Sequence, residues 1–394
     1  MSNLPKGWEL VQFDKVCDIR DGTHDSPKYI ENGVPFITSK HLTDNGIDFT
    51  ETNYISEENH IEFSKRSKVD NGDILFGMIG TIGKPVIVNT DFEFSIKNVA
   101  LLKLSSNELL SNIYVLNLLK SNIIINQFLK LSNGGVQSFI ALGMIRKLKI
   151  PLPPIEEQKK IADILSTVDK KIAFVEENIN ATEELKKGLM QKLLTEGIGH
   201  TEFKDSELGR IPQSWEVVKF KEITKVRQGL QIPISKRKKE KCENCYEYIT
   251  IQFIKNNKEV EYIENPQKTV ICTENDILMT RTGNTGIVVT NVKGVFHNNF
   301  FLIDFDRNEI SKEYLVYYLN SNSIQKEILL RAGATTIPDL NHGDFYSIKF
   351  ISPPLEEQKQ IAEILSTVDN KLENLKEKKQ SFEELKKGLM QKLL

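Results

Sequence analysis

The stretch PPIEEQK at residues 153–159 decides the architecture of this chain, because PPLEEQK stands at residues 353–359. The two stretches belong to a longer repeat, in which residues 151–194 align with residues 351–394 without a gap. In this alignment 28 of 44 positions are identical, and residues 183–194 recur unchanged as 383–394. Such similarity within one chain indicates a duplicated structural unit, which must be recognised before any fold is assigned.

Weaker similarity links the segments that precede the two copies. The two tryptophans, Trp8 and Trp215, each follow a proline by three positions and precede a glutamate. The triplet DIL occurs at residues 73–75 and again at 276–278. The offset falls from 207 at the tryptophans to 203 at the triplets and 200 at the later repeat, so insertions separate these anchors. The chain therefore has the order A–B–A′–B′.

Units A and A′ are predicted to be mixed α/β domains. Short β-rich runs, separated by Gly, Asn and Asp turns, predict strands at 34–38, 85–89, 248–253, 287–290 and 300–305. One helical stretch is expected before each B unit, at 109–131 and 312–331. The predicted boundaries are 1–152 for the first domain, 153–195 for its helix, 196–210 for a linker, 211–352 for the second domain and 353–394 for the last helix.

Each B unit reads as one long helix. The prolines can open a helix, and the glutamates after them suit the positive N-terminal end of its dipole. Apolar residues alternate at spacings of four and three, the pattern of a coiled-coil seam, at Ile161, Leu165, Val168, Ile172, Val175 and Ile179. We expect the seam to shift near Thr182 and resume at Leu185, Leu189 and Leu193. Such a helix would be roughly 58 Å long, so the other copy is its expected partner rather than its own domain.

Composition limits the possible functions. The 52 Lys and Arg residues nearly balance the 54 Asp and Glu residues, so any positive surface must be local. No apolar run approaches the ~20 residues of a membrane helix, and the first residues do not resemble a signal peptide. Four cysteines do not make a disulfide framework, which favours a cytoplasmic location and no membrane partner.

The order of these parts resembles the specificity subunit of Type I restriction-modification enzymes across the whole chain. The residues that carry the resemblance are the doubled PPIEEQK and PPLEEQK motifs, the ILSTVD that follows each, and the paired openings at Pro5 and Pro212. The Gly-rich turns at 80–83 and 283–286 add to it.

The resemblance implies that A and A′ are target recognition domains and that the two helices pair as an antiparallel coiled coil with pseudo-twofold symmetry. It implies double-stranded DNA and two methyltransferase subunits as partners, with restriction or translocase subunits in the full complex. S-adenosylmethionine, ATP and Mg²⁺ would then belong to the partner subunits, and this chain would carry no cofactor. Because A and A′ differ, the DNA target should be bipartite and asymmetric, with an unread spacer.

A basic run marks the second domain. Residues 219–241 hold nine Lys and Arg against two Glu, and its core is Lys236, Arg237, Lys238 and Lys239, with Arg227 upstream. A loop that faces phosphates is the functional interpretation, and a solvated surface run is the alternative. The matching place in the first domain is less charged and offers Arg20, Thr23, His24 and Lys28 as candidate DNA contacts.

Two further loops carry candidate base contacts. Arg281 and Asn284 flank Gly283, and these residue types pair with guanine and adenine respectively. The counterpart in the first domain lacks such a pair, so both turns could equally be scaffold. The loops before the last strand of each domain add Gln137, Ser138, Thr335, Thr336, Asn341 and His342.

Cys242 and Cys245 have zinc-like spacing, but only Cys272 and the distant His297 could complete a site. Because structural zinc takes four ligands, we expect ordinary thiols rather than a metal site. The segment 77–84 has the wrong glycine spacing for a phosphate-binding loop, and Pro85 replaces its Ser or Thr. No acid, base or nucleophile set recurs in both domains, so the chain is expected to be non-catalytic.

The unchanged segment of the two helices is the expected docking surface for the methyltransferase subunits. Its charged residues are Glu183, Glu184, Lys186 and Lys187, with Glu383, Glu384, Lys386 and Lys387 in the second copy. Two other functions stay open at this point. A self-contained restriction-methylation enzyme lacks its cofactor motifs here. A coiled-coil adaptor between proteins, without DNA specificity, is the main alternative.

Overall fold

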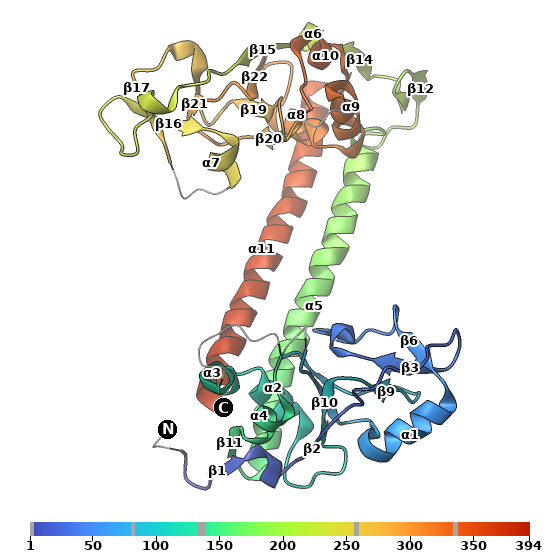
Figure 1. Ribbon diagram of the computed structural model, residues 1–394. Helices are drawn as coiled ribbons and strands as arrows, with labels where there is room; N and C mark the ends of the chain where they lie inside the picture. The colour runs from blue at the N-terminus through green and yellow to red at the C-terminus, as the bar shows by residue number, and fades with distance from the viewer. Residues whose placement is uncertain (1–3, 80–82, 132–138, 256–259, 334–337) are drawn as a thin grey trace. The chain divides into compact units, whose positions relative to one another are not determined.

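The computed structural model describes residues 4–79, 83–131, 139–255, 260–333 and 338–394. The chain forms two compact units, residues 1–177 with 376–394 and residues 178–375. Each unit therefore contains one α/β domain, the first part of the long helix that follows it, and the last part of the other long helix (Figure 1). This mixed helix-and-sheet architecture in tandem confirms the predicted fold class.

Unit 1 is built on two small sheets. Its central sheet has the antiparallel order β2 (Asp18–Asp21), β10 (Val99–Lys103), β7 (Ile74–Gly77) and β8 (Pro85–Ile87). The second sheet has the order β6 (Asn53–Ile55), β3 (Val34–Ile37) and β9 (Ser95–Ile96). The remaining elements are the strand pairs β1 (Glu9–Gln12) with β11 (Lys149–Leu152) and β4 (Leu42–Thr43) with β5 (Gly46–Ile47), and the helices α1 (Glu57–Ser67), α2 (Asn112–Leu119), α3 (Asn122–Leu131) and α4 (Leu142–Arg146).

Unit 2 repeats this plan. Its central sheet has the order β15 (Thr224–Gln228), β22 (Phe300–Phe305), β19 (Ile277–Thr280) and β20 (Val288–Val289). Its second sheet has the order β17 (Tyr262–Glu264), β16 (Cys245–Ile249), β21 (Gly294–Phe296) and β18 (Ile271–Cys272). The remaining elements are β14 (Glu216–Lys219) with β23 (Lys349–Ser352), β12 (Phe203–Ser206) with β13 (Gly209–Pro212), and the helices α6 (Phe220–Ile223), α7 (Ile251–Lys255), α8 (Lys312–Leu319), α9 (Asn322–Ala332) and α10 (His342–Ser347).

Hydrogen bonds explain where four predicted segments differ from the structure. Each single helix expected before a B unit is two helices, because the hydroxyls of Ser121 and Ser321 donate to the preceding turn and break it. The strand expected at 248–253 ends at Ile249, since Thr250 accepts from the Phe253 amide and starts α7. The predicted linker at 196–210 contains β12 and the start of β13, so it is partly a β-hairpin.

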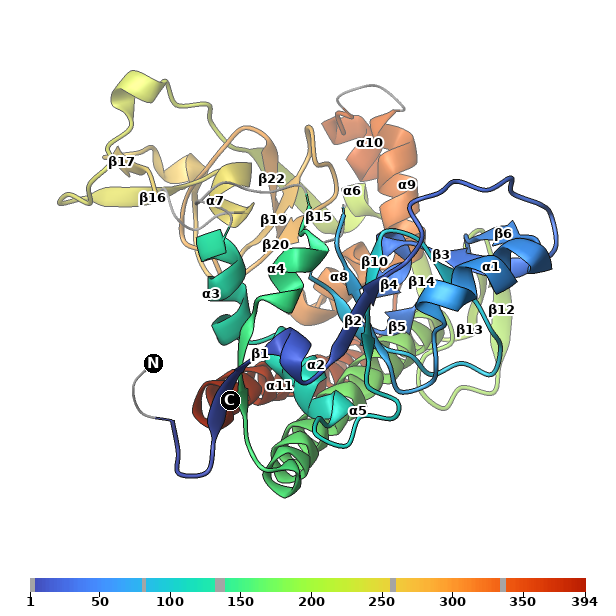
Figure 2. The ribbon, with the colours of Figure 1, turned by 60° about the horizontal axis from the view of Figure 1, so that its bottom comes forward.

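The two long helices, α5 (Ile155–Leu193) and α11 (Leu355–Leu393), lie side by side in Figures 1 and 2. Within unit 1, Asp169 and Glu176 of α5 pair with Lys386 and Lys379 of α11, so the helices run antiparallel, as expected. The predicted shift of the seam is wrong. Thr182 is buried, and the four-three alternation continues from Ile179 through positions 182, 186, 189 and 193, whereas Leu185 and Leu385 are exposed.

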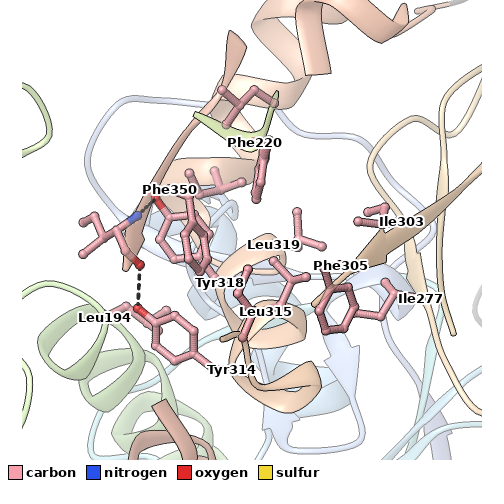
Figure 3. Packing of buried hydrophobic residues seen from close by; sticks show 14 of the residues in the cluster. Leu194, Phe220, Ile277, Ile303, Phe305, Tyr314, Leu315, Tyr318, Leu319 and Phe350 are labelled. Carbon is pink, nitrogen blue, oxygen red and sulfur yellow. Dashed lines mark hydrogen bonds between the residues drawn. The ribbon is translucent and has the colours of Figure 1, made fainter. Parts of the chain in front are cut away.

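Each domain core includes residues of both long helices. In unit 2, Leu193 at the end of α5, the next residue Leu194, and Ile361 and Leu365 of α11 join one cluster with the domain. Figure 3 shows Leu194 among the domain residues of this cluster. In unit 1, Ile161, Leu165 and Leu394 join the corresponding cluster. The helices therefore do not dock on finished domains, because their apolar faces complete the cores.

A buried glutamine fixes the start of each long helix. Gln158 Oε1 accepts from the backbone amide of Ser111 at 3.0 Å, and Gln358 Oε1 accepts from that of Ser311 at 2.9 Å. Each Nε2 donates to two carbonyls, at positions 109 and 153 in unit 1 and at 309 and 353 in unit 2. Both side chains are fully buried. This explains why the repeated motif keeps a glutamine where an apolar residue would be expected.

Candidate nucleic-acid interface

Three connections meet at one edge of the central sheet in unit 1. Because β10 is antiparallel to both β2 and β7, the end of β2, the start of β10 and the end of β7 lie at the same edge. Thr23 donates its backbone amide to Ile96 O at 3.1 Å, which joins the first two connections. Ile79 pairs with Phe139 and so places the residue that follows the undescribed segment 132–138 at this edge. Described residues from separate stretches of the sequence are therefore neighbours here.

A network of polar side chains occupies this edge. Asp21, at the end of β2, is buried and accepts hydrogen bonds from Arg66 of α1 and from His24 Nε2, the latter at 2.9 Å. The other ring nitrogen of His24 lies 2.6 Å from Asn98 Oδ1, just before β10. Arg20 donates to the carbonyl of Arg66 at 3.2 Å and pairs with Asp18. Thr23 is buried and Lys28 is exposed.

Unit 2 has the same edge with different side chains. Gln228 stands opposite Phe301 as Asp21 stands opposite Ala100, and a glycine follows each. A Cβ on Gly22 would lie 2.3 Å from Ile96 O, and one on Gly229 would lie 2.1 Å from Phe296 O. Only glycine allows this close passage of the backbone. Gln228 Nε2 donates to Asn298 O at 3.1 Å, and Arg227 is exposed and donates to Thr269 O.

The two residues predicted to read bases on the turn after β19 have different environments. The Arg281 guanidinium donates to Asp339 at 2.9 Å and to Leu340 O at 3.2 Å, and it packs over the Phe301 ring. These contacts give Arg281 an intradomain role. Asn284, on the same turn, is exposed.

The segment between α9 and β23, expected to be a loop, contains helix α10 and is described only in part. Asn341 caps α10 by accepting from the Asp344 amide at 2.9 Å, and the exposed His342 stacks on Phe301. Gln137, Ser138, Thr335 and Thr336 lie outside the described residues.

The core of the basic run lies beside the second sheet of unit 2, because Lys238 forms a β-bridge with Tyr262 of β17. Lys238 pairs with Glu264 at 2.6 Å, and Arg237 pairs with Glu261 at 2.9 Å while it packs over Tyr248. Lys236 and Lys239 are exposed. The run therefore offers less uncompensated charge than its composition indicates, because two of its four core cations face carboxylates of the same unit.

The charged repeat of the long helices contains two kinds of residue. Lys186 and Lys386 take seam positions, and each pairs at 2.6 Å with an aspartate of the other helix, Asp369 and Asp169 respectively. The remaining predicted docking residues are exposed: Glu183, Glu184, Lys187, Glu383, Glu384 and Lys387.

The cysteines do not form a metal site. Cys242 and Cys245 are joined as a disulfide, which corrects the expectation of free thiols at these two positions. Cys272 is a buried free thiol whose pKa is raised to about 11, chiefly by burial. Within the described residues, no group of His, Cys, Asp and Glu is arranged to hold a metal ion. None of the described helices is long and apolar enough to cross a membrane.

Sequence reasoning missed Arg66, Asn98, Gln228 and Asn298. Arg66 gives no local signal, because only the fold brings the end of α1 to the end of β2. The other three could have been found, since Asn98 and Asn298 precede the matching strands β10 and β22 and Gln228 precedes a glycine that matches Gly22.

Comparison with known proteins identifies the family to which the duplicated chain belongs. The family model described as "Type I restriction modification DNA specificity domain" matches residues 5–184 and again residues 212–384. The chain belongs to this family. It is 31% identical to a specificity subunit called MjaX from Methanocaldococcus jannaschii, over 100% of this chain and 94% of the relative.

Solved structures show the same fold. The S subunit of a Type I restriction-modification system from M. genitalium matches with a TM-score of 0.59 at 16% identity, over 100% of this chain and 98% of that chain. The HsdS subunit from Thermoanaerobacter tengcongensis matches with a TM-score of 0.52 at 19% identity, over 99% and 97% respectively. The family membership confirms the resemblance inferred from the repeated motifs, and it makes DNA target recognition the function of this chain within a restriction-modification system.

Proposed function

We propose that each unit of this specificity subunit reads one half of an asymmetric, bipartite DNA target. The observation that carries the proposal is the pair of matching sheet edges. The backbone at Gly22 and Gly229 is built alike, whereas the neighbouring side chains, Asp21 and Gln228, differ. Two domains that read different DNA sequences need the same backbone geometry with different polar side chains, because base edges are distinguished by their patterns of donors and acceptors.

The domain assignment follows from this proposal. Residues 1–152 and 211–352 are the two recognition domains, and the segments 153–195 and 353–394 are the helices that set the unread spacer. At the sheet edges the candidate DNA contacts are Arg20, Thr23, His24 and Lys28 in unit 1, and Arg227, Asn284, Asn341 and His342 in unit 2. Lys236 and Lys239 are the better candidates for phosphate contacts, since Arg237 and Lys238 pair with acidic residues.

The partners are proposed to be two methyltransferase subunits, with restriction subunits in the full complex. The duplicated exposed charges at Glu183, Glu184 and Lys187 and their counterparts 200 residues later offer two equivalent surfaces. In this assembly the chain is non-catalytic and cytoplasmic, and S-adenosylmethionine, ATP and Mg²⁺ act in the other subunits.

A comparison of DNA methylation tests the function. Genomic DNA from the source cell should carry a bipartite methylated-adenine motif, and deletion of this chain should abolish it. Reintroduction of the full chain should restore the same motif. A motif that survives the deletion would contradict the proposal. Protein–protein assembly without any dependence of methylation on the chain would favour the coiled-coil adaptor instead.

A further inference from the structure

Arg66 and Asp21 form a contact at the recognition edge of unit 1 that the sequence did not indicate. Arg66 stands in the last turn of α1, and its Nη2 donates to Asp21 Oδ1 at the end of β2. The two side chains differ in environment, because that of Asp21 is 9% exposed and that of Arg66 is 63% exposed. One end of this ion pair is therefore anchored within the domain, and the other faces solvent.

The anchored carboxylate fixes the direction of the guanidinium. Asp21 is itself held by His24 Nε2 at 2.9 Å, and His24 is held by Asn98. The carbonyl of Arg66 accepts from Arg20 at 3.2 Å, which ties the end of α1 to β2. An arginine carries five N–H donors in a planar fork, and the contact with Asp21 occupies only part of it. Since the Arg66 side chain is 63% exposed, its remaining donors are accessible to a ligand in solvent.

We propose that Arg66 is a specificity-determining residue of unit 1 that reads guanine in the major groove, with Asp21 as its positioning residue. A bidentate contact of the arginine fork with guanine O6 and N7 is the recognition that this donor geometry fits best. The inference rests on the proposed function, since it requires unit 1 to read its own half of the target. It also explains a difference between the units, because Gln228 replaces Asp21 at the equivalent position of unit 2 and provides no carboxylate there.

The DNA sequence preference of Arg66 variants distinguishes a base contact by Arg66 from a purely structural ion pair with Asp21. In the full complex, Arg66→Ala and Arg66→Lys should both relax the methylated motif at one guanine of the half-site read by unit 1. Loss of a bidentate contact should reduce discrimination at that base pair by about 5- to 150-fold. Asp21→Asn should relax the same position less severely, because the fork is retained but loses its charged anchor.

Two controls isolate the effect. Lys65→Ala removes the neighbouring cation, which pairs with Glu62, and should leave the motif unchanged. Lys268→Ala removes an exposed lysine of unit 2 that is not a candidate DNA contact, and it should leave the half-site of unit 1 unchanged.

Methylation mapping of cells that carry each variant decides the question. An unchanged motif in both Arg66 variants would overturn the inference, even if their thermal stability fell, because the pair would then be only structural. That outcome differs from a failure of the proposed function, in which the wild-type chain itself would have no influence on the motif.

Discussion

Lys186 Nζ of α5 lies 2.6 Å from Asp369 Oδ1 of α11, and Lys386 of α11 makes the same contact with Asp169 of α5. Both lysines occupy seam positions that a heptad pattern would assign to apolar residues. Each contact belongs to a different unit of the chain. The duplicated sequence thus places one cross-helix ion pair in each unit. Polar seam residues of this kind can fix the register of a helix pair.

Reversal of one charge should weaken the helix pair. Lys186→Glu would place a carboxylate beside Asp369 at a position where the lysine side chain is only 29% exposed. We expect a loss of about 1–2 kcal/mol in the free energy of unfolding, somewhat above the value of an exposed pair. Denaturant unfolding of the full chain measures it.

Compensating reversal provides the control. The double variant Lys186→Glu with Asp369→Lys should recover only part of the loss, because Asp369 also accepts from the Tyr317 hydroxyl at 2.8 Å. Lys187→Glu, which replaces an exposed lysine 3.9 Å from Glu184, should change little. Equal losses at positions 186 and 187 would show that the seam contact has no special weight.

The buried glutamines should be intolerant of apolar replacement. Gln158→Leu would leave the Ser111 amide and two carbonyls without their partner inside the protein. Each unsatisfied buried group costs about 1–3 kcal/mol, so the loss in unfolding free energy should exceed 2 kcal/mol. Lys159→Leu, one residue further on and exposed, is the matched control. Thermal unfolding compares the two variants, and similar melting temperatures would contradict this account.

One carboxylate should matter in unit 2 and not in unit 1. Glu357 accepts from Trp215 Nε1 at 2.8 Å and from the Ile198 amide at 3.0 Å, and it pairs with His200 at 2.7 Å. Its counterpart Glu157 is exposed, and Nε1 of Trp8 is buried without a hydrogen-bond partner among the described residues. Glu357→Ala should therefore cost about 2 kcal/mol of unfolding free energy.

The control is the same substitution at the repeat-related position. Glu157→Ala should cost less than about 0.5 kcal/mol, as expected for an exposed side chain. Differential scanning calorimetry of the two variants measures the difference. A larger effect of Glu157→Ala would contradict the assignment of the network to unit 2.

The features that repeat along the chain could be predicted, and those that depend on contacts between distant residues could not. The length and pairing of the helices follow from the doubled motif and the spacing of Ile161 to Ile179. The shift expected near Thr182 was wrong because Leu185 is apolar but faces solvent, while Lys186 occupies the seam through its ion pair. Burial of a long cationic stem with its charge paired has no signature in an apolar pattern.

The candidate site shows the same division. A glycine marks the end of the first strand of each central sheet, Gly22 in unit 1 and Gly229 in unit 2. The sequence also predicts Thr23 and His24 as candidate contacts at this edge of unit 1. Arg66 was missed because its relation to Asp21 spans 45 residues and exists only after α1 has packed on the sheet. Conversely, Arg281 was chosen for its residue type, yet its guanidinium is engaged by Asp339 and Leu340. Residue type indicates what a side chain can bind, whereas its neighbours decide whether it is available.

The continuous seam determines how the length of the unread DNA spacer should respond to longer helices. Because the four-three alternation runs unbroken from Ile161 to Leu193, an insertion of seven residues preserves the seam, whereas four residues would shift its phase. The insertion must be made in both helices, since the end of each helix contributes to the core that contains the start of the other. Seven residues lengthen a helix by about 10 Å, close to three base pairs of DNA at about 3.4 Å each.

Insertion after Ala173 and after Glu373, both on the exposed face, should therefore keep both half-sites and widen the unread gap by about three base pairs. Insertion in α5 alone should abolish methylation, because the seam and both cores could not be satisfied together. Methylation mapping reads the gap directly, and an unchanged gap in the doubly extended chain would show that the helices do not set the spacing.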